Sequence, residues 1–388
     1  MAKPTKRVKA AKPHRDFPLF PHATGRWCKK VKGRFAYFGP VTDDGDHGAQ
    51  DALDRWLAQR DDLLAGRRPR SGPGITLADL ANRFLSAKQS LVESGELSPR
   101  TWKMYFRACG RVVSCFGRST PVEAVGPEDF QRLRMELAKL LAPASLSGEI
   151  VAVRSLFKFG LESELISRPM RFGPGFARPS SKTLRIAHAN GGLRMFEREE
   201  LLKFLRAAGV NLKAMVLLGV NGGLGNTDCA LLPIRAVDLQ GGWLDFPRVK
   251  TGIPRRIPLW PETVEAIKAV LAARCEPLDP ADAHLLFLNL LRGSYVGNRS
   301  GTAIANMTGA TIRRAGIKRP GLSFYSLRRT FQTIAEGSRD MAAVQSIMGH
   351  APAPGDMSAV YRQRVDDARL RAVVDHVRKW LFGTEETK

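Results

Sequence analysis

Two stretches without hydrophobic periodicity divide this 388-residue chain and constrain its fold more than any other feature. Residues 67–74 consist of arginine, proline, glycine and serine, and residues 167–194 combine prolines and glycines with basic residues. Such compositions are typical of linkers, and we expect the second one to be extended. The chain therefore predicts a basic tail and three folded parts: residues 1–15, 16–66, 75–166 and 195–388.

The first folded part, residues 16–66, predicts a small α+β domain. Residues 25–31 and 34–38 are strand-like and meet at Lys32-Gly33, which is a hairpin signal. The apolar residues that follow recur at helical spacing and end before Gly66, a helix stop. These residues are Ala49, Leu53, Trp56, Leu57, Leu63 and Leu64.

The second folded part, residues 75–166, predicts a four-helix domain. Thr76 suits the N-cap of one helix, and Ser98 before Pro99 is the favoured pair at the start of another. Residues 127–141 and the apolar positions between 150 and 157 predict two more helices.

The third folded part, residues 195–388, predicts helices around one strand pair. Residues 244–250 and 256–259 are strand-like and flank Thr251-Gly252. The overall fold class is therefore mainly α with small β-sheets. The C-terminal apolar residues recur at helical intervals and predict a terminal helix: Leu370, Val373, Val374, Val377, Trp380 and Leu381.

The charge of the chain favours a polyanionic partner. There are 61 basic and 37 acidic residues, a net charge of +24, and nucleic acid is the usual partner of such an excess. A solvated basic surface and a membrane-surface protein are the alternatives, but neither a strongly amphipathic basic helix nor a lipidation signal supports the membrane.

Other classes of protein are disfavoured by what the chain lacks. Its apolar runs are too short to span a membrane, and the basic start, Met1 to Lys12, is not followed by the apolar stretch of a secretory signal. The five cysteines are scattered and lack metal-ligand spacing. We therefore expect a cytoplasmic, nucleoid-associated protein without a metal or another cofactor.

Five short motifs follow one another in the last folded part. They are Gly223-Leu224-Gly225-Asn226-Thr227-Asp228, Lys250-Thr251-Gly252 before Ile257-Pro258-Leu259, Tyr325-Ser326-Leu327-Arg328-Arg329-Thr330, Met348-Gly349-His350, and Tyr361. In this order they resemble motifs of the tyrosine recombinase, or phage integrase, family: Gly-Leu-Arg-x-x-Glu, the β-hairpin lysine, His-x-Leu-Arg-His-Thr, Leu-Gly-His and the nucleophilic tyrosine. The first two folded parts resemble the arm-type and core-type DNA-binding domains of integrases.

The resemblance implies a metal-free reaction at a DNA phosphate. Tyr361 would attack the scissile phosphate, forming a 3′-phosphotyrosine link and a free 5′-hydroxyl. Arg328 would hold the negative charge of the transition state, because a guanidinium is planar, always charged and bidentate. His350 would donate to the same oxygens or accept the tyrosine proton, and Lys250 would protonate the departing 5′-oxygen.

Two positions depart from the family motifs. Gly225 stands where the family has its first phosphate-binding arginine, and Tyr325 stands in place of the histidine, although its hydroxyl can still donate. A lost donor of this kind commonly costs about 3–4 kcal/mol. Residues that could reach the phosphate instead are Asn226, Arg235, Arg255 and Arg256.

Three functions remain open at this point. The leading one is site-specific DNA breakage and rejoining, as in the integration or excision of a mobile element. The second is a catalytically inactive relative that binds DNA as a regulator or an architectural protein. The third is a topoisomerase-like enzyme that relaxes DNA with the same tyrosine chemistry.

Basic side chains in the first two folded parts are candidates for contacts with the DNA backbone. They are Lys29, Lys30, Lys103, Arg107, Arg111, Arg154 and Lys158. The expected partners are double-stranded DNA, further copies of the chain in a tetramer on DNA, and accessory DNA-bending proteins. The terminal helix either packs on its own domain or, as often in the family, docks on a neighbouring subunit.

Overall fold

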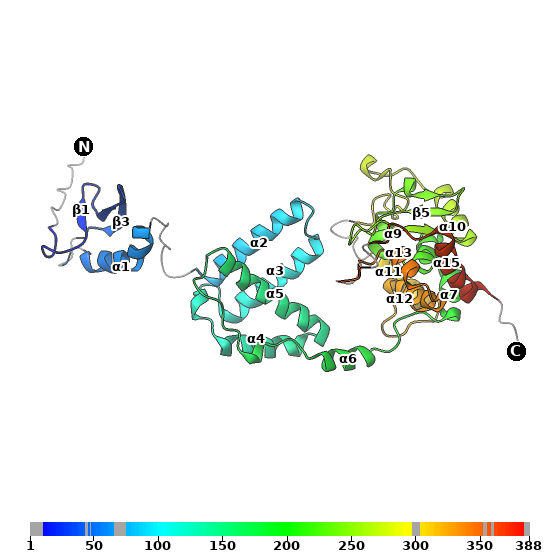
Figure 1. Cartoon of the computed structure of the whole chain (residues 1–388), viewed down its shortest axis with the longest axis horizontal. Helices are drawn as coiled ribbons and strands as arrows, with labels where there is room; N and C mark the ends of the chain where they lie inside the picture. The colour runs from blue at the N-terminus through cyan, green and yellow to red at the C-terminus, as the bar shows by residue number, and fades with distance from the viewer. Residues whose placement is uncertain are drawn as a thin grey trace. The chain divides into compact units, whose positions relative to one another are not determined.

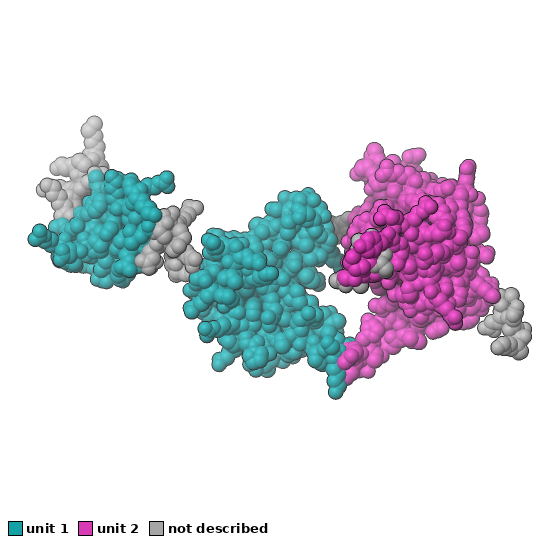
Figure 2. Space-filling model, in the orientation of Figure 1, with its two compact units in different colours: residues 1–184 teal, residues 185–388 magenta. Residues whose placement is uncertain are grey.

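The computed structural model describes residues 11–42, 46, 48–65, 75–296, 303–351, 355–357 and 361–383, without the side chains of Ala58, Asp61, Asp62 and Ala65. Most of the predicted basic tail and the predicted linker at residues 67–74 lie outside these ranges. The chain divides into two compact units, residues 1–184 and 185–388 (Figure 2). Within the first unit, two separate hydrophobic cores form.

The first core belongs to a three-stranded antiparallel sheet and one helix (Figure 1). The elements are β1 (Phe20–His22), β2 (Arg26–Val31), β3 (Arg34–Pro40) and α1 (Ala49–Ala65). Lys32 and Gly33 both have positive φ, 48° and 81°, and join β2 to β3 where Val31 pairs with Arg34. This is the two-residue turn that matches the twist of a hairpin, so the predicted hairpin is present.

The second core belongs to four helices, as the periodicity predicted. They are α2 (Leu77–Glu93), α3 (Pro99–Phe116), α4 (Pro127–Leu140) and α5 (Pro143–Glu162). Thr76 and Asp79 form a capping box at the start of α2, and the Ser98 side chain accepts from the Thr101 amide at the start of α3. These bonds satisfy amides that have no partner within the helix.

Residues 167–194 are not extended throughout, although the boundary between the two units falls inside this range. The 3-10 turn η2 (Pro174–Phe176) and the helix α6 (Ser181–Ala189) lie inside it. Phe176 is fully buried, and its ring centroid lies 5.2 Å from that of Phe130. Aromatic burial of this size outweighs the local preference of prolines and glycines for open chain.

The C-terminal unit surrounds one buried helix. Nearly every residue of α8 (Val210–Gly222) from Leu212 onward is buried, and α8 packs against α10 and α12. The other helices are α7 (Arg198–Ala207), α9 (Asn226–Ala230), α10 (Pro261–Ala272), α11 (Ala303–Arg314), α12 (Phe324–Ala335), α13 (Met341–Met348) and α15 (Asp367–Phe382).

A small antiparallel sheet, in the order β4-β5-β6, completes this unit. Its strands are β4 (Val237–Asp238), β5 (Trp243–Asp245) and β6 (Arg256–Pro258). The strands of the predicted pair are thus shorter than expected, although Leu244 does pair with Ile257. Beyond β5 only single backbone bonds continue the ladder, from the Phe246 amide to Arg255 and from the Arg248 amide to Ile253, because Pro247 and Pro254 lack the amide hydrogen that a ladder requires.

The terminal helix α15 packs on its own unit. Its buried residues are Leu370, Val373, Val374, Val377 and Leu381. The Trp260 indole donates to the Val374 carbonyl at 2.9 Å, and Arg378 pairs with Glu262 at 2.6 Å. The structure therefore contains the first of the two predicted arrangements, in which the terminal helix packs on its own domain. None of the described helices has the length and apolar content needed to cross a membrane.

Candidate active site

Arg328 lies at the centre of the candidate site. It projects from α12, is 3% exposed, and donates to the Gly223 carbonyl at 2.6 Å and to the Met348 carbonyl at 2.7 Å. Burial, together with the charge of nearby Arg248, lowers the pKa of Arg328 to about 10. The guanidinium is thus still charged at neutral pH and is held rigidly by backbone from two distant segments.

The turn after α13 brings the other groups to Arg328. Gly349 ends the helix with a φ of 59°, and its carbonyl accepts from Arg248 Nη1 at 3.3 Å and from Thr251 Oγ1 at 3.2 Å. A Cβ on Gly349 would lie 2.9 Å from side-chain carbons of Arg248 and Arg255. Only glycine therefore fits between the hairpin and α13.

His350 follows directly in this turn and is partly buried. Its pKa is lowered from the usual histidine value by burial and then by the positive charges of Arg328 and Arg248. At neutral pH its imidazole is therefore mainly uncharged, which suits a proton acceptor.

A buried ion pair supports the site from behind. Arg255 is 3% exposed and donates to Asp228 Oδ1 at 3.2 Å and to the Phe246 carbonyl at 3.0 Å. Burial is the main reason why the pKa of Arg255 is lowered. Asp228 also accepts from the Gly225 amide at 2.8 Å and so caps α9. Asp228 thus neutralises Arg255 and fixes the turn at Gly225.

The remaining predicted catalytic residues are exposed. Lys250 lies at the end of the hairpin, and Tyr325 lies in the first turn of α12 with 49% of its surface exposed. The Arg329 guanidinium lies 5.4 Å from the Tyr325 ring centroid. Tyr361 is 76% exposed. Within the described residues, no hydrogen bond joins Lys250, Tyr325 or Tyr361 to Arg328.

Arg248 was not predicted from the sequence as a site residue. The structure distinguishes it from the four residues that were expected to replace the family arginine missing at Gly225. Arg256 is held by Asp245 and Asp367 and lies over the Trp243 ring at 4.0 Å. Arg255 is held by Asp228, and the other two considered, Asn226 and Arg235, lie at the start of α9 and in the 3-10 turn η3 (Ile234–Ala236). The signal for Arg248 was its position two residues before Lys250 in the hairpin motif.

The predicted DNA-binding residues of the first unit fall into two groups. Several engage partners in the fold: Arg111 with Glu149 at 2.8 Å, Lys158 with Glu162 at 3.4 Å, Arg154 with the Phe176 carbonyl at 3.0 Å, Lys29 over the Trp56 ring at 4.5 Å, and Lys30 over the Phe35 ring at 5.8 Å. Lys103 and Arg107 are exposed one turn apart on α3, where Arg107 Nε also donates to the Lys103 carbonyl. A role in DNA binding stays a prediction for all seven.

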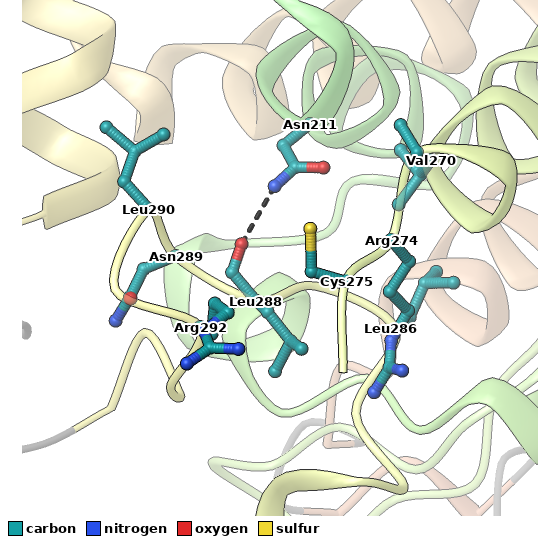
Figure 3. A pocket seen from close by; sticks show the side chains of 10 residues that line it. Asn211, Val270, Arg274, Cys275, Leu286, Leu288, Asn289, Leu290 and Arg292 are labelled. Carbon is teal, nitrogen blue, oxygen red and sulfur yellow. Dashed lines mark hydrogen bonds between the residues drawn. The ribbon is translucent and has the colours of Figure 1, made fainter. Parts of the chain in front are cut away.

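A pocket of about 190 Å³ lies elsewhere in the C-terminal unit (Figure 3). It is lined by Asn211 of α8 and by residues from α10 and the loops that follow, and Asn211 donates to the Leu288 carbonyl at 2.9 Å. None of the candidate catalytic residues lines this pocket. Among the residues that the structure describes, no cluster of three or more histidine, cysteine or acidic side chains could hold a metal ion.

Comparison with known proteins places this geometry in a family. Residues 192–364 match the model of the phage integrase family. This range contains all of the candidate catalytic residues. Residues 192–364 therefore form a domain of the phage integrase, or tyrosine recombinase, family.

Solved integrases share the fold. A lambda integrase fragment, solved as a dimer bound to a COC′ core site, is 15% identical with a TM-score of 0.56 and covers 76% of this chain and 100% of that chain. A lambda integrase tetramer bound to a Holliday junction is also 15% identical, with a TM-score of 0.56 and coverage of 87% and 96%. A Tn1549 transposon integrase fragment in complex with circular intermediate DNA is 16% identical, with a TM-score of 0.52 and coverage of 77% and 99%. No curated protein matches the sequence.

Proposed function

We propose that this protein breaks and rejoins DNA at a specific site through a 3′-phosphotyrosine intermediate. The observation that carries the proposal is the group of Arg328, Arg248 and His350 around one turn, Met348–His350. Arg328 and Arg248 donate to the adjacent carbonyls of Met348 and Gly349, so two guanidinium groups are oriented by the same two peptide units. Such preorganised donors suit an oxyanion that gains charge in a transition state.

In the proposed reaction the Tyr361 oxygen forms a bond to phosphorus, and the bond from phosphorus to the 5′-oxygen breaks. His350 accepts the tyrosine proton, which its lowered pKa favours. Lys250 gives a proton to the departing 5′-oxygen. Arg328 holds the non-bridging oxygens. In the reverse reaction, a 5′-hydroxyl attacks the phosphotyrosine and restores the DNA backbone.

The site would bring Tyr361 to the phosphate when DNA is bound. Tyr361 is 76% exposed and follows Arg328 and His350 in the chain. Loop and terminal segments commonly change conformation when a partner binds. The relatives solved on DNA as a dimer and as a tetramer support double-stranded DNA and further copies of this chain as the partners.

A second candidate is a catalytically inactive protein that binds and bridges DNA. Gly225 supports it, because this position supplies only a backbone amide, which Asp228 already occupies. Both functions require DNA binding, but they differ in covalent chemistry.

The test compares the wild-type protein with Tyr361→Phe in the source cell. Each protein is captured under a denaturing wash, and the DNA that stays attached is sequenced. We expect DNA from the wild type alone, with reads that converge on one site. DNA that is recovered from both proteins only under a native wash would reject the recombinase and favour the inactive binder. Relaxation of any supercoiled plasmid, without a preferred site, would indicate a topoisomerase-like activity.

A further inference from the structure

Arg248 lies in the candidate active site, but the family motifs give this arginine no role. Its backbone is fixed within the hairpin, since its amide donates to Ile253 at 2.8 Å and its carbonyl accepts from Thr251 at 3.1 Å and from Gly252 at 2.8 Å. Its side chain crosses to the turn after α13, where Nη1 donates to the Gly349 carbonyl at 3.3 Å. The guanidinium therefore has a defined position.

The charge around Arg248 is not balanced. Asp228 is the carboxylate of this region, and it pairs with the buried Arg255. No carboxylate among the described residues forms an ion pair with Arg248 or Arg328. A buried positive charge with a second one nearby is costly unless an anion joins them. The arrangement is that of an anion site.

Arg248 has unused donors that solvent can reach, whereas Arg255 Nη1, which has no hydrogen-bond partner among the described residues, is buried. Arg248 is partly exposed, unlike Arg255 and Arg328. Among the described residues, its Nε and Nη2 atoms have no hydrogen-bond partner, whereas Arg328 uses two nitrogens on backbone carbonyls. Two parallel donors on one guanidinium match two oxygens of a phosphodiester.

We propose that Arg248 binds the scissile phosphate in place of the arginine that the family carries at the position of Gly225. This inference rests on the proposed function of the same site. Arg248 and Gly225 lie on either side of Asp228, whose Oδ1 accepts from the Val249 amide at 3.4 Å and whose Oδ2 accepts from the Gly225 amide at 2.8 Å. The Asp228 carboxylate thus binds the backbone of Val249, next to Arg248, and the backbone of Gly225, where the family has its arginine.

The position of Gly225 allows a direct exchange of the two arginines. Its φ of −95° is open to any residue, and a Cβ there would meet only Asp228 Oδ2, at 3.5 Å. An arginine at this position therefore fits without strain in the backbone. If Arg248 performs the task of the missing residue, Gly225→Arg is expected to restore part of what Arg248→Ala removes.

The experiment measures the rate of covalent adduct formation on a nicked oligonucleotide that contains the site recovered by denaturing capture. The variants are Arg248→Ala, Arg248→Lys, the double variant Arg248→Ala with Gly225→Arg, and Arg206→Ala, an exposed arginine of α7, as the control. We expect Arg248→Ala to lose about a hundredfold in rate and Arg248→Lys to lose less, because lysine keeps the charge but not the paired donors. The double variant should regain about tenfold or more. Equal rates for Arg248→Ala and Arg206→Ala would overturn the inference.

A second measurement separates this inference from the proposed function. If the wild type forms no adduct, the recombinase is rejected, and the salt dependence of DNA affinity then decides the role of Arg248. Loss of one phosphate contact lowers the slope of log affinity against log salt by about one. A lower slope for Arg248→Ala than for Arg206→Ala would support phosphate binding, and an equal slope would refute it. Circular dichroism of each variant shows whether the helical content is retained.

Discussion

Arg154 and Arg328, one in each unit, make similar hydrogen bonds in different surroundings. Arg154 donates to the Phe176 carbonyl at 3.0 Å, and Arg328 donates to the Gly223 and Met348 carbonyls. The Arg154 guanidinium lies 4.6 Å from the Phe172 ring centroid, so its neighbours are aromatic. The charged neighbours of Arg328 are Arg248, Arg255 and Asp228, and His350 also lies close to it. The hydrogen bonds fix both arginines, but Arg328 lies in a group where three arginines share one carboxylate, Asp228.

A similar difference separates two basic residues of the first unit from the cations of the candidate site. In the first unit, Arg111 pairs with Glu149 and Lys158 with Glu162. In the C-terminal site, Asp228 faces several cations. The net charge of +24 predicts a polyanionic partner but does not locate its site. We infer its location from the cluster of Arg248, Arg255 and Arg328, where one carboxylate serves several cations.

The largest expected effect is a loss of stability when Asp228, the carboxylate of the candidate site, is removed. Asp228→Ala leaves Arg255 buried without a counterion, so we expect the free energy of unfolding of the C-terminal unit to fall by about 3–5 kcal/mol. The control is Asp245→Ala, which breaks an exposed pair with Arg256 and should cost at most about 1 kcal/mol. Hydrogen exchange of peptides from α8 and α12 measures both. Equal losses would mean that Asp228 is not needed to balance the buried cations.

The next effect tests the two arginines directly. Arg328→Lys should lower the rate of adduct formation by about a hundredfold or more, since a lysine cannot keep both carbonyl bonds and still orient toward a phosphate. Arg154→Lys should change this rate by no more than about threefold, because surface substitutions away from a reacting centre usually alter free energies by roughly 0.5 kcal/mol. The comparison of the two regions fails if both variants lose the same rate.

Several parts of this molecule could be predicted because short-range chemistry determines them. Lys32-Gly33 predicted the first hairpin, Thr76 and Ser98 predicted the starts of α2 and α3, and the ordered motifs predicted the family. In these cases, one or two neighbouring residues supply the decisive interaction.

Other parts could not be predicted because distant residues decide them. Part of residues 167–194 is folded because the rings of Phe172 and Phe176 pack against those of Phe130 and Phe157. Arg248 joins the candidate site because Gly349, about a hundred residues later, presents its carbonyl. Neither partner can be read from local composition, since tertiary packing overrides it.

A smaller effect separates free from engaged cations in the first unit. Lys103→Ala should lower the slope of log DNA affinity against log salt by about one if the exposed Lys103 contacts a phosphate. Arg154→Ala should lower the slope less than Lys103→Ala does, because its guanidinium is already engaged by Phe176 and Phe172. Fluorescence anisotropy at several salt concentrations measures both slopes. A slope that falls only for Arg154→Ala would reverse the assignment.

The smallest effect is a shift in pH dependence at His350. Burial and the charges of Arg328 and Arg248 lower the pKa of this imidazole, so its uncharged form prevails at neutral pH. As the pH falls through that pKa, His350 takes up a proton and can no longer accept the one from Tyr361. The second-order rate of adduct formation, which reports the free protein, should therefore decline on the acid side, with its midpoint below the usual histidine value.

The pH midpoint of adduct formation should depend on Arg248 in the C-terminal unit but not on Arg154 in the first unit. Arg248→Ala removes one of the positive charges that disfavour protonation of His350, so the midpoint should move upward while Arg154→Ala leaves it in place. Arg248→Lys keeps the charge and should keep the midpoint, although it lowers the rate. A rate that rises as the pH falls would instead assign His350 the role of proton donor. A midpoint that is equal in Arg248→Ala and the wild type would mean that Arg248 lies too far from His350 to act on the same phosphate.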